Sequence, residues 1–599
     1  MPPEKIELPP KYYLTYFQYL IDFVKKKYQH ILNENEQQFL SDFEALTEDE
    51  KCLFIRFCNR TGSFFRTEKL KYVEIENIPE SLNGLIDKGF VEPLSENHLT
   101  EAAEVLDIFS KAELIELAKM LNLETRGKAS LKKEEVLDWL LQITDWQEIV
   151  DWIAEAPPAA PRGGAFSKDK LEAYSDEKAP PLGAGGAVIK VIKETEVQML
   201  KFLFFGSRHG DMTEFVTRDL GFQTYEKFDE DKMVAYFQTR QEVEDKLKVS
   251  LAREDFYLMQ QADIEILDIY NWFMDWTETH RKELSEIAIP TYGTFSLRVA
   301  LYLEKKKALD EALTIFRLTE ESPSRERQVR ILDKQKNREE AKALCELILS
   351  EPQNATEQFF AEDYLNRIEA ILLKKKSKKA VTQQLHGSES ITIPATWKRQ
   401  VEFGVIDYYQ NRNMKAEFTE NHLWRSLFGL LFWDIIFDTE SLAIHHPLQR
   451  SPSDLFKPTF FEKRREKMEE RLKMLEDEDA TIIYMNRIFF EKFGLTNPLV
   501  QWYGGLFPLI LTVLEKLSPE QITLITLEMA KNLRQNLRGF PDLFIWADGE
   551  YSFIEVKSPT DSLSNQQLFW LRFFESINVR SKVLRVEWAV EDLEIVLRK

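Results

Sequence analysis

The 599-residue sequence has few cysteines and no long apolar run. Its cysteines, Cys52, Cys58 and Cys345, are too few for a disulfide framework, and the first two have no His or Cys neighbours at zinc-binding spacing. We therefore expect all three to pack in the core. The longest apolar stretches, 427–437 and 506–514, are shorter than the roughly 20 residues that span a bilayer, which argues against a membrane protein. The N-terminal sequence lacks the plan of a secretory signal, so we expect an intracellular protein.

Basic residues are also in the minority, with 79 Lys and Arg against 101 Asp and Glu and a formal net charge of −22. This acidity argues against nonspecific binding to polyanions. It does not exclude an enzyme that acts on DNA, because a local basic surface is enough to bind phosphate. Aromatic residues are abundant, and 42 Phe, 19 Tyr and 12 Trp exclude disorder for most of the chain. The length predicts about three to five domains.

The pattern of the first 150 residues predicts helices that carry many aromatic side chains. Residues 1–104 are compatible with a small winged-helix-like bundle. Residues 105–150 predict two short helices, the first opened by a capping box of Ser110 and Glu113. The basic turn 126–128 between them makes this segment resemble the SAP module, a small helical DNA-binding unit. Its phosphate contacts would then include Arg126 and Lys128, whereas a plain helical hairpin with a solvated basic edge is the alternative.

Proline and glycine are concentrated in residues 156–187, which we interpret as a linker. Residues 188–390 are expected to be almost entirely helical. Two segments that start at Asp310 and Glu339 share their pattern of Ala, Leu and Pro at a 29-residue offset, which predicts a tetratricopeptide-like (TPR-like) region. The densest basic run of the chain follows, either a solvated helix end or a patch that binds DNA phosphate, and it contains Lys374, Lys375, Lys376, Lys378 and Lys379.

The stretch that carries chemistry is a predicted β-hairpin in residues 540–557, where apolar runs flank an Asp-Gly turn signal. Strand alternation places Glu555 and Lys557 on one face, and Asp542 at the start of the first strand can meet them across the hairpin. Two carboxylates suit Mg²⁺ or Mn²⁺, and a lysine can orient water or stabilise charge on a phosphoryl group. The set predicts metal-assisted phosphodiester hydrolysis. An ordinary surface hairpin with an exposed ion pair is the alternative.

These residues resemble the PD-(D/E)xK nuclease superfamily and, within it, the VRR-NUC domain. The resemblance rests on Pro541-Asp542, on Glu555-Val556-Lys557 and on the continuation 558–571, in which Ser558 stands where the family usually has Gly. Upstream, residues 420–437 and 449–461 resemble the Fanconi-associated nuclease family. With the SAP-like segment and the helical middle, this resemblance covers most of the chain in the same order.

The resemblance implies a multidomain, mostly α protein with a C-terminal α/β PD-(D/E)xK nuclease core in residues 395–599. It also implies a site: Asp542 and Glu555 as principal metal ligands, Glu420 and Val556 in the same metal site, Lys557 as the catalytic lysine, and Gln449 as a neutral residue that orients water or phosphate. Arg534 and Arg538 are candidates for binding the DNA backbone, with a solvated charge as the alternative for each. Arg534 matches a basic position of the family, whereas Arg538 stands where the family more often has Gly.

Glu420 can also be assessed from periodicity alone. It shares one helical face with the apolar residues Leu423, Leu427 and Leu431, and a carboxylate on such a face is costly unless it is paired or bound to a cation. Alternatively, Glu420 lies in the first turn, where the helix N-terminus stabilises an exposed carboxylate.

The resemblance implies a structure-selective DNA nuclease that needs Mg²⁺ or Mn²⁺ and acts on branched or flapped DNA. It would cut near 5′ flaps, degrade DNA in the 5′-to-3′ direction and serve the repair of interstrand cross-links. Two alternatives stay open: a junction-resolving or restriction-type nuclease with the same core, and a catalytically inactive scaffold that binds DNA structures. The intact Asp542, Glu555 and Lys557 argue against the scaffold.

Overall fold

The computed structural model describes residues 7–155, 188–372 and 388–589, and most of these residues are helical. None of the helices in these ranges combines the length and the apolar character needed to cross a membrane. The chain divides into two compact units, which we describe separately. Unit 1 comprises Met1–Phe222 and Ala235–Arg240, and unit 2 comprises Gln223–Val234 and Gln241–Lys599.

Unit 1 contains a small antiparallel sheet in the order β1-β3-β2, formed by Phe64–Arg66, Val188–Val191 and Val91–Pro93. Aromatic residues fill the core beside it, as the sequence indicated; Phe54, for example, packs edge-on against Phe90. The helices of unit 1 are α1 (Tyr12–Tyr28), α2 (Glu34–Glu44), α3 (Glu48–Cys58), α4 (Ile78–Asp87), α5 (Ala102–Asp107), α6 (Lys111–Met120), α7 (Lys133–Ile143), α8 (Trp146–Glu155), α9 (Glu194–Phe205) and α10 (Thr213–Asp219).

Helices α5–α8 are inserted between the paired strands β2 and β3. The backbone N–H of Leu94, directly after β2, donates to the carbonyl of Val188 at the start of β3, at 2.9 Å. Side chains of α5–α8 form a core that also includes Phe64 and Val188. We expected the helical middle of the chain to begin at residue 188, and this boundary is wrong. The apolar residues of β3 complete the sheet of unit 1, and α9 and α10 belong to the same unit.

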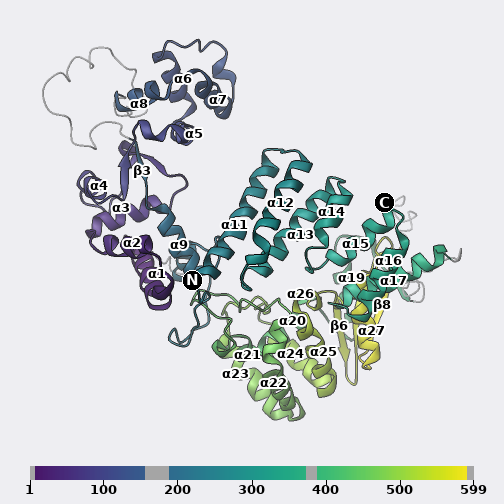
Figure 1. Cartoon of the computed structure of the whole chain (residues 1–599). Coiled ribbons are helices and arrows are strands. Elements are labelled where there is room, and N and C mark those ends of the chain that lie inside the picture. The colour runs from purple at the N-terminus through teal and green to yellow at the C-terminus, as the bar shows by residue number, and fades with distance from the viewer. Residues whose placement is uncertain (1–6, 156–187, 373–387, 590–599) are drawn as a thin grey trace, which may run out of the picture. The chain divides into compact units, whose positions relative to one another are not determined.

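Unit 2 begins with a series of helical hairpins (Figure 1). The two segments with the shared pattern form α14 and α16, in which Ala312 and Ala341 are both fully buried at equivalent positions. A continuous core runs from Val249 to Ile368. The helices are α11 (Arg240–Gln261), α12 (Ile266–His280), α13 (Ile289–Lys305), α14 (Leu309–Phe316), α15 (Ser324–Lys334), α16 (Arg338–Ser350) and α17 (Ala355–Leu372).

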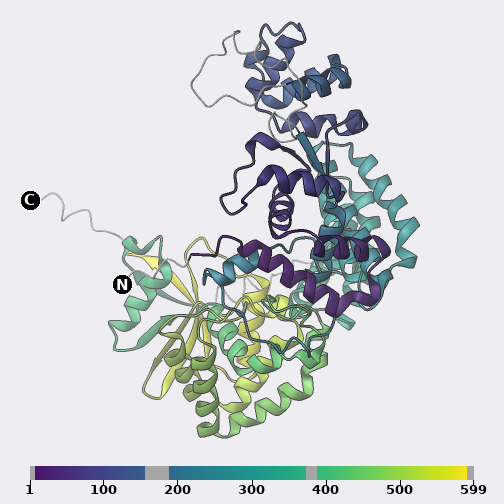
Figure 2. The ribbon, with the colours of Figure 1, turned by 90° about the vertical axis from the view of Figure 1, so that its left-hand side faces the viewer.

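A five-stranded mixed sheet follows in unit 2, in the order β4-β8-β7-β6-β5 (Figure 2). Strand β8 runs parallel to both β4 and β7, whereas β5, β6 and β7 are antiparallel neighbours. The strands are β4 (Glu389–Ile393), β5 (Lys415–Phe418), β6 (Leu543–Ala547), β7 (Glu550–Lys557) and β8 (Ser581–Trp588). The C-terminal α/β part of the chain therefore begins at the edge strand β4 and not at residue 395 as expected. The helical chain with this C-terminal α/β part confirms the predicted fold class.

The two faces of the sheet carry different helices. Ile554 and Val556 pack with Val405 of α19 (Val401–Gln410), whereas Phe553 packs with Phe574 of α27 (Asn565–Ser576). Because side chains alternate along β7, α19 and α27 lie on opposite faces. The remaining helices are α20 (His422–Leu431), α21 (Trp433–Ile436), α22 (Thr459–Lys473), α23 (Glu478–Lys492), α24 (Leu506–Lys516), α25 (Pro519–Lys531) and α26 (Leu533–Asn536).

Candidate active site

The predicted hairpin is confirmed and brings two carboxylates and a lysine together. Strands β6 and β7 pair with Leu543 opposite Ile554, so Asp542 directly precedes the paired segment. The backbone N–H of Val556 donates to Oδ2 of Asp542 at 2.9 Å, which holds this carboxylate against β7. Glu555 is 0% exposed and Lys557 is 8% exposed, and Lys557 Nζ lies 2.8 Å from Glu555 Oε1. The alternative of an exposed surface pair is therefore wrong.

Gln567 joins this group from α27. Its Nε2 donates to Oε1 of Glu555 at 2.6 Å, and its Oε1 accepts from Lys557 Nζ at 3.3 Å and from the backbone N–H of Ser564 at 2.9 Å. Gln567 lies within the stretch 558–571 that resembles the VRR-NUC domain, but no role was predicted for it. The signal that places it here is the Ser564-x-x-Gln567 capping box, because this box fixes the glutamine in the first turn of α27.

Burial and mutual repulsion disfavour ionisation of the two carboxyls. Burial raises the pKa of Asp542 to about 6, even though the hydrogen bond from Val556 and the charge of Lys557 act in the other direction. Burial and the charge of Asp542 raise the pKa of Glu555 to about 8. The charge of Glu402, on α19, adds to the rise of the Asp542 pKa. Glu402 was missed by sequence reasoning, since no local pattern links α19 to the hairpin.

The donor set fits a hard divalent cation. Oε2 of Glu555 is buried and has no hydrogen-bond partner among the described residues, so one lone carboxylate oxygen remains for a ligand. A cation there would offset the repulsion between Asp542 and Glu555. In the described part of the chain, no group of three or more His, Cys, Asp and Glu side chains is arranged to hold a metal ion. Backbone carbonyl oxygens and water can complete the coordination of such a cation.

Glu420 lies beside the pair, but not on a helix as both alternatives for it assumed. Helix α20 begins at His422, and Glu420 has a φ of +28° in the preceding turn. Its backbone N–H donates to the carbonyl of Asp542 at 2.9 Å, and its exposed carboxylate accepts from Asn421 Nδ2 at 2.9 Å. Its negative charge contributes to the raised pKa values of Asp542 and Glu555. The apolar residues do follow a helical period, but the helix begins only at His422, and Glu420 lies in the turn before it.

Gln449 uses its side-chain amide within its own loop. Nε2 donates to the carbonyls of Ala443 and Ser451, both at 2.7 Å, and Oε1 accepts from the backbone N–H of His445 at 2.8 Å. The amide is therefore occupied by contacts within the loop. Its three contacts close the loop between Ala443 and Ser451.

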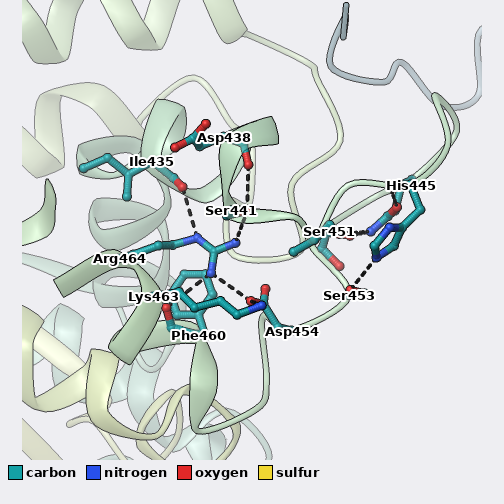
Figure 3. A network of polar contacts seen from close by, with 12 residues as sticks. Ile435, Asp438, Ser441, His445, Ser451, Ser453, Asp454, Phe460, Lys463 and Arg464 are labelled. Atoms are coloured by element: carbon teal, nitrogen blue, oxygen red, sulfur yellow. Dashed lines mark hydrogen bonds and ion pairs between the residues drawn. The ribbon is translucent and has the colours of Figure 1, made fainter. Parts of the chain in front are cut away.

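A buried arginine connects the segments on either side of this loop to α22 (Figure 3). Arg464 is 1% exposed, and its guanidinium donates to Asp454 Oδ2 at 3.0 Å and to Ser441 Oγ at 2.7 Å. It also donates to the carbonyls of Ile435 and Phe460, each at 3.2 Å. One side chain thus ties the segments before and after the loop to α22.

The arginines expected to bind the DNA backbone lie just upstream of Asp542 and are exposed. Arg534 Nη1 lies 3.3 Å from Oε2 of Glu321, so its guanidinium forms an ion pair with the loop between α14 and α15. Arg538 accepts from Trp570 Nε1 through its carbonyl at 3.0 Å, which leaves its guanidinium outside this contact.

The two residues of unit 1 that were expected to contact DNA, Arg126 and Lys128, flank Gly127 between α6 and α7. Gly127 has a left-handed backbone with a φ of +79°. Arg126 is exposed, and Lys128 Nζ lies 4.7 Å from the centre of the Trp139 ring. The capping box of Ser110 and Glu113 is present as expected. The lysine run, Lys374, Lys375, Lys376, Lys378 and Lys379, lies outside the described residues.

Comparisons with known proteins agree with a nuclease-like site at Asp542, Glu555 and Lys557. Residues 11–92 match the family described as "FAN1, HTH domain", and residues 476–588 match the VRR-NUC domain, which contains Asp542, Glu555 and Lys557. The chain is 26% identical to a Fanconi-associated nuclease 1 homolog of Pseudomonas aeruginosa over 97% of both chains. It is 21% identical to the homolog of Schizosaccharomyces pombe over 96% of this chain and 91% of that one.

Solved structures share the fold. The crystal structure described as paFAN1 bound to 2nt 5′flap DNA with gap superposes with a TM-score of 0.78 and 24% identity, covering 98% of this chain and 100% of that one. A second, described as bound to 1nt 5′flap DNA with gap, has a TM-score of 0.74 and 24% identity, covering 97% of this chain and 100% of that one.

Proposed function

Because the chain belongs to the Fanconi-associated nuclease family, we propose that it is a structure-selective DNA nuclease that hydrolyses phosphodiesters near a 5′ flap with Mg²⁺ or Mn²⁺. The observation that carries the proposal is the convergence of Asp542, Glu555 and Lys557 within the VRR-NUC match. Both solved structures of paFAN1 are bound to 5′ flap DNA, and we propose the same substrate class here.

In the proposed mechanism the carboxylates of Asp542 and Glu555 would hold the cation, with Glu420 and the carbonyl of Val556 as further candidate ligands. Such an ion would supply a nucleophilic water at neutral pH and polarise the scissile phosphoryl group. Lys557 is held at 2.8 Å from Glu555 and presents an ammonium that donates to a phosphate oxygen or to the attacking water. Burial keeps bulk water away, which strengthens these interactions.

Basic residues away from the carboxylates are proposed to hold the DNA. Arg534 and Arg538 precede Asp542 and would contact the backbone near the cut, while Arg126 and Lys128 would contact it from unit 1. The lysine run from Lys374 to Lys379 is proposed for the same role. We further propose degradation in the 5′-to-3′ direction and a role in interstrand cross-link repair. Such substrates arise inside the cell, where we expect the protein to act.

The test is cleavage of an end-labelled 5′-flap duplex with Mg²⁺, with Mn²⁺ and with EDTA. We expect cutting near the branch that EDTA abolishes and that Asp542→Asn abolishes without loss of flap binding. Asp548→Asn, which changes an exposed carboxylate in the turn of the same hairpin, should cut normally. Absence of cutting on flap, fork, nick and single strand with both metals would support the DNA-binding scaffold instead. Preference for four-way junctions in the same panel would support the junction-resolving nuclease.

A further inference from the structure

A row of aromatic rings lies beside the strand end that carries Asp542. Phe403 on α19 stacks on Phe418 at the end of β5 with ring centres 6.2 Å apart and planes inclined by 23°. Phe418 lies 6.2 Å from the ring of His422, and His422 lies 5.6 Å from that of Tyr503. The last two are also joined through His422 Nε2 and Tyr503 Oη at 3.2 Å. We call these four side chains the aromatic row.

The aromatic row is attached to Asp542 through the backbone. Phe418 pairs with Leu543, the residue that follows Asp542. Thr419 and Glu420, which connect Phe418 to the rest of the aromatic row, both donate their backbone N–H to the carbonyl of Asp542, at 2.8 and 2.9 Å. At the other end, Phe403 directly follows Glu402, whose charge acts on Asp542. The backbone between Phe418 and His422 is therefore fixed to the strand end from which Asp542 projects.

Phe403 is not accounted for by packing. It is 50% exposed, although its helix α19 buries Val405 and Tyr409 against the sheet. Phe418, His422 and Tyr503 are each half-buried, so the row presents ring surface to solvent along its length. Exposed aromatic surface next to a site that processes a polymer indicates a contact with that polymer.

The charges around the aromatic row select the kind of contact. Glu402 and Glu417 directly precede Phe403 and Phe418 in the sequence, and Glu420 lies between Phe418 and His422. Acidic surroundings repel phosphate but accept the neutral face of a nucleobase.

We propose that the aromatic row is a stacking site for one unpaired nucleobase next to the scissile phosphate, with Phe403 as the exposed platform. The proposal rests on the proposed nuclease function and specifies which part of the DNA the site recognises. A base within a duplex keeps both faces covered by its neighbours, so only an unpaired nucleotide can offer a face to Phe403. Because every base has such a face, the preference would be for single-strandedness and not for sequence.

The experiment is a double-mutant cycle between the ring and the base. Cleavage rates of the full-length protein are measured on 5′ flaps in which each nucleotide around the cut is replaced in turn by an abasic site. We expect one position at which the abasic site slows wild-type cleavage by about 5- to 100-fold, as expected for the loss of one stacked base. Phe403→Ala should slow cleavage of the intact flap to a similar degree, and the abasic site should then cause no further loss.

Phe403→Trp should restore dependence on the base, whereas Phe403→Leu, which keeps an apolar side chain of similar volume, should not. Phe490→Ala removes a 65% exposed ring on α23 and serves as the matched control, with full dependence on the base expected. If the losses from Phe403→Ala and from the abasic site multiply at every position, stacking is wrong while the nuclease function stands. If the wild-type protein cuts no flap at all, the proposed function itself fails, and this inference fails with it.

Discussion

Gln567 and Glu555 are joined by a hydrogen bond of 2.6 Å from Nε2 to Oε1, which leaves Oε2 of Glu555 as the oxygen without a partner in the described chain. The same glutamine caps the first turn of α27 through Ser564. One amide therefore fixes both the start of a helix and the orientation of a proposed metal ligand.

Loss of this amide should weaken metal-dependent cleavage. Gln567→Leu is expected to lower kcat/KM on a 5′ flap by about 10- to 100-fold and to raise the Mn²⁺ concentration required, because Glu555 and Lys557 lose their shared partner. The matched control is Gln521→Leu, which removes the corresponding capping-box glutamine of α25. It should cost similar stability and leave metal dependence unchanged. Full activity of Gln567→Leu would contradict the positioning role.

The metal-free protein should lose stability as pH rises. The pKa values of Asp542, about 6, and Glu555, about 8, lie above those of unfolded carboxyls, so the folded state binds more protons than the unfolded state. The free energy of unfolding therefore falls as pH rises from roughly 4 to 8. Melting temperatures in EDTA at pH 5, 7 and 9 should show Glu555→Gln gaining on wild type as pH increases. Parallel pH profiles for the two proteins would refute this.

Arg464 should be far more important for stability than an exposed neighbour on the same helix. Arg464→Ala leaves buried Asp454 with only the more distant Lys463, whose Nζ lies 3.8 Å away, and is expected to lower the free energy of unfolding by about 3–5 kcal/mol. Lys467→Ala removes an exposed ion pair with Asp438 and should cost less than about 1 kcal/mol. Urea unfolding of both variants measures the difference. Equal losses would show that the buried contacts of Arg464 stabilise the protein no more than an exposed ion pair does.

Gln449 should act through its loop. Gln449→Ala leaves two carbonyls and one N–H of the loop without their partner, so the melting temperature should fall while the Mn²⁺ dependence of cleavage stays as in wild type. Differential scanning fluorimetry and a metal titration measure the two quantities. A variant with unchanged melting temperature but abolished cleavage would restore Gln449 to the active site.

The basic turn between α6 and α7 should contribute to DNA binding through charge alone. Arg126→Ala is expected to weaken flap binding equally for all sequences and to reduce the slope of log affinity against log salt by about 1. Lys128→Ala should act similarly, although part of its effect would come from lost contact with Trp139. Lys71→Ala, which removes an exposed lysine outside this turn, is the control. Unchanged salt dependence of Arg126→Ala would support the plain helical hairpin.

The hairpin of Asp542 and Glu555 was predictable because its signals are local: alternation, a turn and a short separation. The backbone turn at Glu420 was not, since the spacing that places Glu420 on the apolar face gives no sign that α20 begins only at His422. Glu402 and Gln567 reach the site from helices on opposite faces of the sheet, and only tertiary packing brings them there. The pairing of β3 with β2 was likewise hidden, because almost a hundred residues separate the two strands.

Helices α5–α8 lie between β2 and β3 in the sequence, and the two ends of this insertion are adjacent in the sheet of unit 1. There the backbone N–H of Leu94 donates to the carbonyl of Val188. A segment whose two ends meet in this way is a cassette: it can lengthen, shorten or be exchanged between relatives without altering the strands that carry it. What such an exchange must preserve is the apolar cover over Phe64 and Val188, because these two side chains complete the core of the inserted helices.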